Sequence, residues 1–511
     1  MKFKYIWLFT LLVGVLSCEE NESPIPEEVM LPELSSGTAD FSNYVAVGAS
    51  FTAGFTDGAL FRASQENSFP NILSQQFIKL GAGEFSQPLM NDNIGGLLIG
   101  GMPNDNFLPR LFFNGAGPAR LPATPTTEGA ASLGGTFKNM GVPGAKSFHL
   151  LFDGYGNPAN LSLGLANPYY VRMASSPSAT ILGDAIAQNP TFFTLSEIGG
   201  NDVLGFATTG GDGSNPITDS STFDASFNAL VNTLTSNGAK GVVSNVPYVT
   251  DLPFFTTVPN NALVLDAATA GQLTGVFQAV SGIFLQGAIL QGVPPAQAQA
   301  LATQYAITFN EGPNRWIIDT PVSATNPLGF RQMTEDELLV LTIDQAALAQ
   351  QGYGTVALTP EVLQVLGLLQ QGGTPTPQQA GLVIAAVNGI DDKDVLDTDE
   401  LTAIRTATDA YNATMAAVVN ANENIALVDL NTTLSEIASN GINFDSFNLT
   451  ADLVTGGAVS LDGIHLNARG YAFMANKFLE AIDENFGSNF VASGNVAKAV
   501  DFQTNYSATL Q

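Results

Sequence analysis

The chain has 511 residues, of which 45% are hydrophobic, and its 46 acidic residues outnumber 17 basic ones, giving a formal net charge of −29. Such a charge repels phosphate backbones, so nucleic acid is a poor candidate partner. The length allows one large domain or several ordinary ones. Only 12% of the residues are charged, so much of the polar surface must consist of uncharged side chains, as suits a protein outside the cytoplasm.

The N-terminus has the charge and hydropathy layout of an export signal. Two lysines precede an apolar run over residues 5–16, which is shorter than the roughly 20 residues that a membrane-spanning helix needs. Residues 15–18 (Val-Leu-Ser-Cys) resemble the lipobox of a bacterial lipoprotein, and Cys18 is the only cysteine of the chain. This resemblance implies a signal peptide over residues 1–17, lipidation of Cys18 and a location on the periplasmic or exposed face of an outer membrane. An ordinary cleaved signal peptide is the alternative.

The residues that follow Cys18 predict an extended tether. Residues 19–22 (Glu-Glu-Asn-Glu) resemble the acidic export tag of surface lipoproteins in Bacteroidetes-like bacteria, although a solvated acidic linker explains them equally well. Three prolines follow before residue 33, and proline-rich segments are extended. The tether is expected to cover residues 18–40, ahead of the folded domain.

Short apolar runs predict the strands of a buried parallel sheet. Each run has four to six residues, as buried strands do, and helix-like segments lie between them. This alternation predicts an α/β fold with helices on both faces of the sheet. The predicted strands cover residues 44–47, 192–195, 241–246 and 425–430.

Two helices are predicted in the C-terminal part of the chain. Residues 399–420 repeat apolar side chains on one face and lead directly into the last predicted strand. Residues 468–484 show the same periodicity and follow Asn467, a good N-cap residue. His465 is therefore expected in the loop just before a helix.

The chain is much longer than a five-strand βα domain requires, and most of the excess lies in residues 253–394. Thr334 with Glu337 has the pattern of a capping box, and Thr359-Pro360 supplies an N-cap followed by proline, so a helical insertion is predicted. Because this insertion follows a strand end, it is a candidate cap over a site, with an apolar stripe that includes Phe277 and Phe284. Packing of this stripe on a core away from the site is an equal alternative.

Four short stretches carry the residue types of a hydrolytic site. Ser50 follows the first predicted strand between two glycines, which let the backbone turn sharply there. Glycines and an asparagine in the next two stretches are suitable donors for an oxyanion hole. In the last stretch Asp462 stands three residues before His465, and such a partner fixes the tautomer of a histidine. The stretches are residues 48–54 (Gly-Ala-Ser-Phe-Thr-Ala-Gly), 139–144 (Asn-Met-Gly-Val-Pro-Gly), 198–202 (Ile-Gly-Gly-Asn-Asp) and 462–465 (Asp-Gly-Ile-His).

In this order the four stretches resemble the blocks of the SGNH hydrolase family, also called the GDSL family. The resemblance covers residues 42–250 and 399–485 and implies a flavodoxin-like αβα sandwich with a parallel sheet. The expected organisation is a signal peptide (1–17), a tether (18–40), a hydrolase core in two parts (41–252 and 395–488), the helical insertion (253–394) and a C-terminal tail (489–511).

The resemblance also implies a serine esterase that needs no cofactor. In it Ser50 resembles the nucleophile, His465 the general base and Asp462 its orienting carboxylate. The implied oxyanion donors are the N–H groups of Ser50 and Gly144 and the side chain of Asn201. The expected substrate is a small-molecule ester, an acetylated glycan or a lipid ester. Because the imidazole must be neutral to accept a proton, activity is expected to rise towards mildly alkaline pH.

Two positions stand out against the family pattern. Ala49 occupies the place of the aspartate in the family's name motif, so any support that this carboxylate gives to the serine loop must come from elsewhere. Glu197 ends an otherwise apolar predicted strand. It is interpreted as a solvated strand-end residue, with a substrate-facing polar group as the alternative.

Other kinds of site have weaker support. The acidic run over residues 391–400 lacks the EF-hand spacing and is interpreted as a solvated linker that ends in a helix start. With two histidines and one cysteine in the chain, no metal site is expected. The alternatives to an esterase are an acyltransferase that uses the same serine and a surface lipoprotein that binds glycans or lipids without catalysis.

Overall fold

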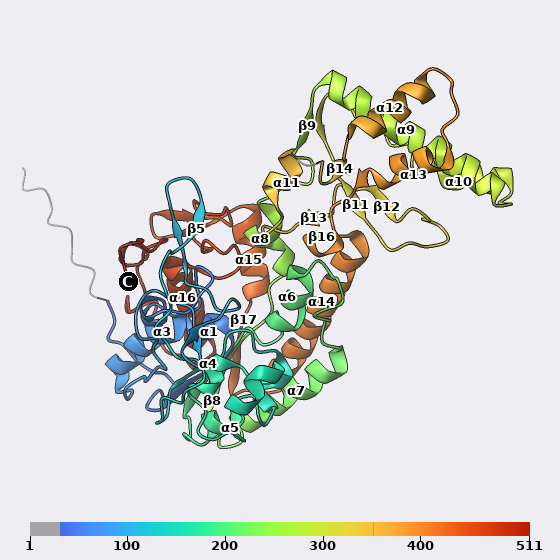
Figure 1. Cartoon of the computed structure of the whole chain (residues 1–511). Coiled ribbons are helices and arrows are strands. Elements are labelled where there is room, and N and C mark those ends of the chain that lie inside the picture. The colour runs from blue at the N-terminus through green and yellow to red at the C-terminus, as the bar shows by residue number, and fades with distance from the viewer. Residues whose placement is uncertain (1–30, 351) are drawn as a thin grey trace, which may run out of the picture.

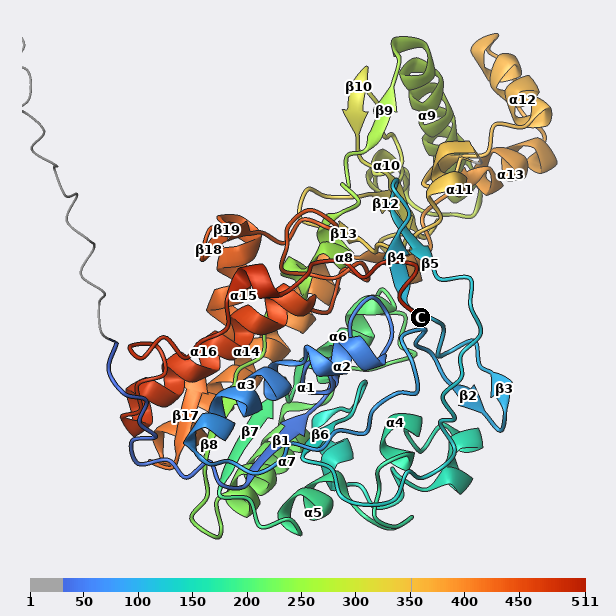
Figure 2. The same ribbon diagram turned by 90° about the vertical axis from the view of Figure 1, so that its left-hand side faces the viewer.

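The computed structural model describes residues 31–350 and 352–511 (Figure 1). The predicted signal peptide, the lipidation site Cys18 and the first part of the predicted tether lie outside these residues. At the centre of the described chain is a five-stranded sheet in which every neighbouring pair is parallel. In sheet order its strands are β17 (Ile425–Val428), β8 (Lys240–Ser244), β7 (Phe192–Ser196), β1 (Tyr44–Gly48) and β6 (Asn139–Gly141), as Figure 2 shows.

The α/β class predicted from the apolar runs is confirmed. Successive strand residues point to opposite faces of a sheet, and here both faces are buried. Val45 and Val47 belong to one apolar core, whereas Tyr44 and Ala46 belong to the other. The first core is covered by α5 (Ile181–Ile186), α6 (Gly200–Thr208), α7 (Ser220–Leu234) and α14 (Thr398–Asn420). The second is covered by α3 (Phe69–Phe77), α15 (Leu430–Ser439) and α16 (Ala468–Phe486).

The two predicted C-terminal helices form at the expected places. The Asp397 carboxylate accepts the N–H groups of Asp399 and Glu400 at the start of α14, and the Asn467 side chain accepts the N–H of Gly470 at the start of α16. These caps satisfy N–H groups that have no partner inside a helix. The end of the acidic run thus starts a helix, as predicted.

The sheet brings several loops to one edge. Gly48 at the end of β1 pairs with Ser196 on β7 and with Gly141 on β6, so three strands end side by side. From β1 the chain continues to β6 on one side and then to β7 on the other. The strand order therefore reverses between β1 and β7, and open α/β sheets bind ligands in the crevice at such a point.

The insertion forms a lobe that projects from the sheet (Figures 1 and 2). It begins after α8 (Pro253–Thr256) and ends near β16 (Val395–Leu396). The helical prediction is correct only in part, because the lobe also contains short antiparallel strand pairs. Its helices are α9 (Ala267–Leu290), α10 (Pro295–Thr303), α11 (Gln345–Gln350), α12 (Pro360–Gln370) and α13 (Pro377–Ala385). Its strands are β9 (Leu263–Leu265), β10 (Gly312–Asn314), β11 (Ile317–Asp319), β12 (Phe330–Gln332), β13 (Leu338–Leu339), β14 (Thr355–Val356) and β15 (Val387–Asn388).

The predicted capping box at Thr334 and Glu337 does not start a helix. Glu337 does accept the Thr334 N–H at 2.7 Å, but its carboxylate also binds the guanidinium of Arg331 at 2.5 and 2.9 Å. This ion pair holds a fully buried carboxylate at the start of β13. The second predicted start is correct, since α12 begins with Thr359 as N-cap and Pro360 as its first residue.

The apolar stripe of the insertion packs inside the lobe. Val276, Phe277 and Val280 on α9 are fully buried in a core formed with α12, α13 and the strand pairs, and Ile283 and Phe284 pack against it. Among the described residues α9 alone has the length and apolar composition of a membrane span, a test that core helices also pass. Of the two alternatives for this stripe, packing on a core away from the site is therefore confirmed, and the stripe does not form a cap over the site.

Both ends of the described chain pack on the core. Within the predicted tether, the Thr38 N–H donates to the Phe486 carbonyl at 2.8 Å and Ala39 is buried. Within the predicted C-terminal tail, Tyr506 is buried beside the guanidinium of Arg110, which donates to the carbonyls of residues 506, 507 and 510. Residues 35–40 and 489–511 thus belong to the folded domain and do not extend from it.

Candidate active site

Ser50 lies directly after β1, at the start of the short helix α1 (Ser50–Ala53), and is 6% exposed. The preceding turn is tight, because a Cβ at Gly48 would lie 2.1 Å from Thr52 Oγ1 and 2.7 Å from the Ser196 carbonyl. Only glycine fits there. The strand end, the glycine and the turn together aim the serine into the edge of the sheet where β1 and β7 meet.

His465 and Asp462 are held together on the loop before α16. The Asp462 Oδ2 to His465 Nδ1 distance is 2.9 Å, and both side chains are largely buried. Burial alone would raise the pKa of Asp462, but the neighbouring imidazole and the N–H groups of Ile464 and His465 lower it to about 2. Asp462 is therefore ionised and able to fix the histidine ring.

The Asp462 carboxylate has further partners that the sequence did not reveal. It accepts the Gly58 N–H at 2.8 Å and the Ser460 hydroxyl at 2.9 Å. Ser460 in turn accepts the N–H of Asp57, and Asp57 accepts the N–H of Leu461. These bonds join the loop after α1 to the loop before α16, and so connect the two parts of the chain that carry Ser50 and His465.

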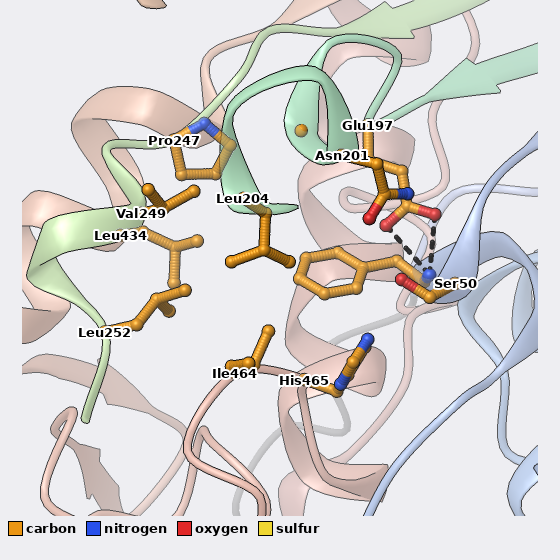
Figure 3. A pocket seen from close by; sticks show the side chains of 12 residues that line it. Ser50, Glu197, Asn201, Leu204, Pro247, Val249, Leu252, Leu434, Ile464 and His465 are labelled. Atoms are coloured by element: carbon orange, nitrogen blue, oxygen red, sulfur yellow. Dashed lines mark hydrogen bonds between the residues drawn. The ribbon is translucent and has the colours of Figure 1, made fainter. Parts of the chain in front are cut away.

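Ser50, His465 and Asn201 line the same pocket. Figure 3 shows the Ser50 hydroxyl and the imidazole of His465 facing each other. The two groups share no hydrogen bond among the contacts of the described residues, and such bonds in catalytic sites often tighten only when substrate binds. The rings of Phe51 and Phe55 lie against the imidazole, with centroids 5.9 and 4.6 Å away, and limit its movement.

Of the three predicted oxyanion donors, Ser50 and Asn201 line the pocket and Gly144 does not. Asn201, in the first turn of α6, lines the pocket and donates one amide hydrogen to the Ala145 carbonyl at 3.0 Å. The amide has a second hydrogen to offer. Gly144, with a left-handed φ of 80°, lies next to Ala145 on the loop after β6 but does not line the pocket. Within the described chain, the N–H groups of Ser50 and Gly144 have no hydrogen-bond acceptor.

The predicted role of Asn201 as an oxyanion donor implies that Asn201→Ala lowers kcat by about 10²–10³-fold. The same change removes the bond to Ala145. Steady-state kinetics on an ester substrate measure the effect, and thermal unfolding checks that the loop after β6 still folds. A kcat within threefold of the wild type would show that Asn201 is not an oxyanion donor.

Apolar side chains form the rest of the pocket wall. They come from α6, from the segment after β8, from α15 and from the loop that carries His465. Figure 3 shows them on one side of the pocket, with Ser50, Glu197, Asn201 and His465 on the other. These side chains are Leu204, Pro247, Val249, Leu252, Leu434 and Ile464. The pocket therefore offers an apolar surface beside a small polar cluster.

Helix α8, from which the insertion starts, and Leu341 at the base of the insertion support the loop that carries His465. The Phe254 N–H donates to the Gly463 carbonyl at 3.0 Å, and the Leu341 N–H donates to the Phe254 carbonyl at 2.7 Å. Gly463 has a φ of 75°, and a Cβ there would lie 2.9 Å from the Phe254 nitrogen. The base of the insertion thus supports the turn between Asp462 and His465, while the lobe's own core lies elsewhere.

Phe277→Ser is expected to lower the free energy of unfolding by about 3–5 kcal/mol, as loss of a fully buried aromatic ring does, without changing the preference for ester chain length. The matched variant Leu204→Ala lies in the pocket wall and should change that preference. Thermal unfolding and rates on a series of esters measure both. A changed preference in Phe277→Ser at unchanged stability would restore the cap hypothesis for α9.

Glu197 is buried, so its interpretation as a solvated strand-end residue was wrong; because it lines the pocket, the alternative of a substrate-facing polar group stays a prediction. It is 7% exposed, and its two carboxylate oxygens accept the Phe51 N–H at 2.7 and 2.8 Å. Burial raises the pKa of Glu197 to about 8, although the N–H groups of Phe51 and Thr52 act against this. One feature of the sequence could have indicated that Glu197 is buried. It stands at the end of an apolar strand, and the strands of parallel sheets are usually buried along their whole length.

In the described chain, neither His149 nor the acidic run over residues 391–400 lines the pocket that holds Ser50. Burial is the main cause that lowers the pKa of His149 to about 4, and the charge of Lys146 contributes less. The ring of His149 stacks on that of Tyr155. In the acidic run, Asp397 caps α14 and Asp394 accepts the Tyr353 hydroxyl. Over the described residues, no group of three or more His, Cys, Asp or Glu side chains has an arrangement that could hold a metal ion.

The candidate site is thus assembled from distant parts of the chain. Ser50 comes from the loop after β1, Asn201 from α6, and Asp462 with His465 from the loop before α16. A hydroxyl, an imidazole with its carboxylate and an amide donor are the groups that nucleophilic acyl transfer requires. No family model, no curated protein and no solved structure matches this chain.

Proposed function

We propose that this protein is a serine esterase of the SGNH type. The observation that carries the proposal is that Ser50 and His465 face each other in one pocket while Asp462 binds His465 Nδ1 at 2.9 Å. The strand order supports it, because numbering the five strands along the chain gives 2-1-3-4-5, the order of flavodoxin-like sheets. Ser50 and Asn201 follow the two strands between which that order reverses.

In the proposed reaction, His465 Nε2 removes the proton of Ser50 as its oxygen attacks the ester carbonyl. Asp462 holds the ring through Nδ1 and stabilises the imidazolium. The Asn201 amide and the Ser50 N–H stabilise the oxyanion. The imidazolium then gives its proton to the leaving alcohol, and an acyl-enzyme remains. A water molecule, deprotonated by His465, releases the acid and restores the serine.

The pocket wall favours an apolar acyl group over acetate. Leu204, Val249 and Ile464 lie beside the polar cluster, and burial of each methylene of an acyl chain against such side chains contributes about 0.8 kcal/mol. A longer acyl chain therefore gains binding free energy that an acetyl group lacks. We infer that the substrates are esters of fatty acids and not acetylated glycans.

A series of chromogenic esters from acetate to decanoate tests both parts of the proposal. The esterase predicts turnover in the wild type and none in Ser50→Ala, and the apolar wall predicts a kcat/KM that rises from acetate to a longer chain. Absence of turnover on every ester would contradict the esterase. Turnover of acetate alone would contradict the acyl pocket and leave the esterase in place.

We further propose that the protein is anchored by a lipid on Cys18, which lies outside the described residues. The basis is the sequence of residues 15–18 after a short apolar run. Cys18→Ser is expected to move the protein from the membrane fraction to the soluble fraction, because the acyl chains of the anchor hold the protein at the membrane. Fractionation with immunodetection measures this. A Cys18→Ser protein that stays in the membrane fraction would rule out the lipid anchor.

A further inference from the structure

A buried carboxylate binds the backbone directly after the candidate nucleophile. Glu197 is the residue after β7, and both of its oxygens accept the N–H of Phe51, at 2.7 and 2.8 Å. Oε1 also lies 3.4 Å from the Thr52 nitrogen. Figure 3 shows the carboxylate reaching across from the end of β7 to the Ser50 loop. In the described chain no Lys, Arg or His forms a salt bridge with Glu197, so these N–H groups are its main polar partners.

The backbone of Glu197 is shaped to make this contact. Its φ is 55°, in the left-handed region that residues other than glycine and asparagine rarely adopt. Its own N–H donates to the Ser244 hydroxyl on β8 at 3.1 Å, which fixes the strand end. An uncommon backbone conformation at a buried carboxyl group persists only where the surroundings determine it, and such residues cluster at functional sites.

The contact constrains Ser50 itself. The Phe51 nitrogen belongs to the peptide group that begins at the Ser50 carbonyl carbon, so fixing this N–H fixes the plane of that peptide. The Phe51 ring, held by the same bond, lies against the imidazole of His465. Without an acceptor, the Phe51 N–H would be a buried donor without a partner. The loop would have to move to satisfy it.

We propose that Glu197 is the positioning residue of the nucleophile loop, which supplies from the neighbouring strand the carboxylate that Ala49 does not provide. The inference rests on the proposed esterase function for its catalytic consequence. Glu197 does not touch the reacting atoms in this scheme. It acts through the Phe51 peptide, and its loss lets Ser50 leave the direction in which His465 can deprotonate it.

Glu197→Met tests the inference, because methionine keeps most of the volume but accepts no hydrogen bond from the Phe51 N–H. We expect kcat to fall about 10²-fold, as a small misplacement of a reacting group does, with KM within threefold of the wild type. Hydrogen exchange measured by mass spectrometry should be faster in the peptide that contains Phe51 and Thr52. Glu197→Gln keeps one acceptor oxygen and should fall between the wild type and Glu197→Met in both measurements.

Asp483 provides a matched control. Its carboxylate accepts two consecutive backbone N–H groups, those of Phe490 and Val491, both at 2.8 Å, and the Ser488 hydroxyl, so it also ties a loop backbone to a regular element, although it is less buried than Glu197. It lies near the far end of α16, about 20 Å along the helix axis from the end next to His465. Asp483→Ala should lower the melting temperature and leave kcat and the exchange of the Phe51 peptide unchanged.

The outcomes separate the inference from the esterase proposal. Unchanged exchange in the Phe51 peptide, or a wild-type kcat in Glu197→Met, would overturn the positioning role. An equal loss of kcat in Asp483→Ala would also overturn it, since general destabilisation would then explain the effect. If Glu197→Met fails to fold, Glu197→Gln carries the comparison. If the wild type turns over no ester, the proposed function fails, and hydrogen exchange alone decides whether Glu197 holds the loop.

Discussion

Ser50→Ala and His465→Ala are each expected to lower kcat on an ester by about 10⁶-fold, the scale on which loss of a nucleophile or its base acts in serine hydrolases. Ser50 lies in a pocket where the imidazole faces its hydroxyl, and among the described residues no other serine lines that pocket. Because its side chain belongs to neither apolar core, Ser50→Ala should melt close to the wild type. His465→Ala should melt at a lower temperature, because it removes the partner of the buried Asp462 carboxylate. Kinetics at a fixed pH and thermal unfolding measure the two expectations.

The double variant sharpens this test. Residues that act as one unit are not additive, so Ser50→Ala/His465→Ala should be scarcely slower than either single variant. Losses that multiply would mean that the two residues act in separate steps. A His465→Ala enzyme with near wild-type activity would end the assignment of the catalytic base.

Asp462→Asn is expected to lower kcat by about 10⁴-fold, because an amide at this position favours the wrong tautomer of His465. The two carboxylate oxygens of Asp462 now accept several donors, including the N–H groups of Gly58 and Ile464. Asparagine offers only one oxygen, and its NH₂ group faces donors in place of the other. A loss of about 1–3 kcal/mol in the free energy of unfolding is therefore expected as well.

The pH dependence of stability gives a second measure of the same residue. The folded protein lowers the pKa of Asp462 from 3.8 to about 2. A lowered pKa contributes stability that is present above pH 3.8 and is lost as the pH falls through 2, by about 2 kcal/mol in total. The difference in unfolding free energy between the wild type and Asp462→Asn should shrink over this range in urea denaturation. A constant difference from pH 5 to pH 2 would contradict the ion pair with His465.

The sheet was predictable where a strand is long and apolar. The apolar composition of residues 44–47 and 192–195 predicts buried strands, and the structure has strands there. β6 was missed because Asn139–Gly141 has three residues and only one large apolar side chain. Its strand conformation depends on pairing with β1, which is a contact between distant parts of the chain. Local sequence does not encode such a contact.

In the candidate site, too, contacts between residues close in sequence could be predicted, and contacts between distant residues could not. Asp462 and His465 are three residues apart, so their contact could be expected from the local sequence, and the bond between them is present. The partners of Asp462 on the loop after α1 could not be expected, because Gly58 lies 404 residues away in the chain. For Glu337 a local capping pattern was overridden by the guanidinium of Arg331, which offered the buried carboxylate a stronger partner.

The distance in sequence between Ser50 and His465 has a consequence for the time at which activity arises. The serine loop precedes the whole insertion, whereas the imidazole and its carboxylate follow it. A chain made from its N-terminus at roughly 5–20 residues per second carries the serine for tens of seconds before the histidine exists. For most of that interval β17 is also missing, and α16 follows only after His465, so neither the sheet nor the pocket can be completed. Under the proposed function, the nascent protein should therefore turn over no ester until β17, His465 and α16 have been synthesised.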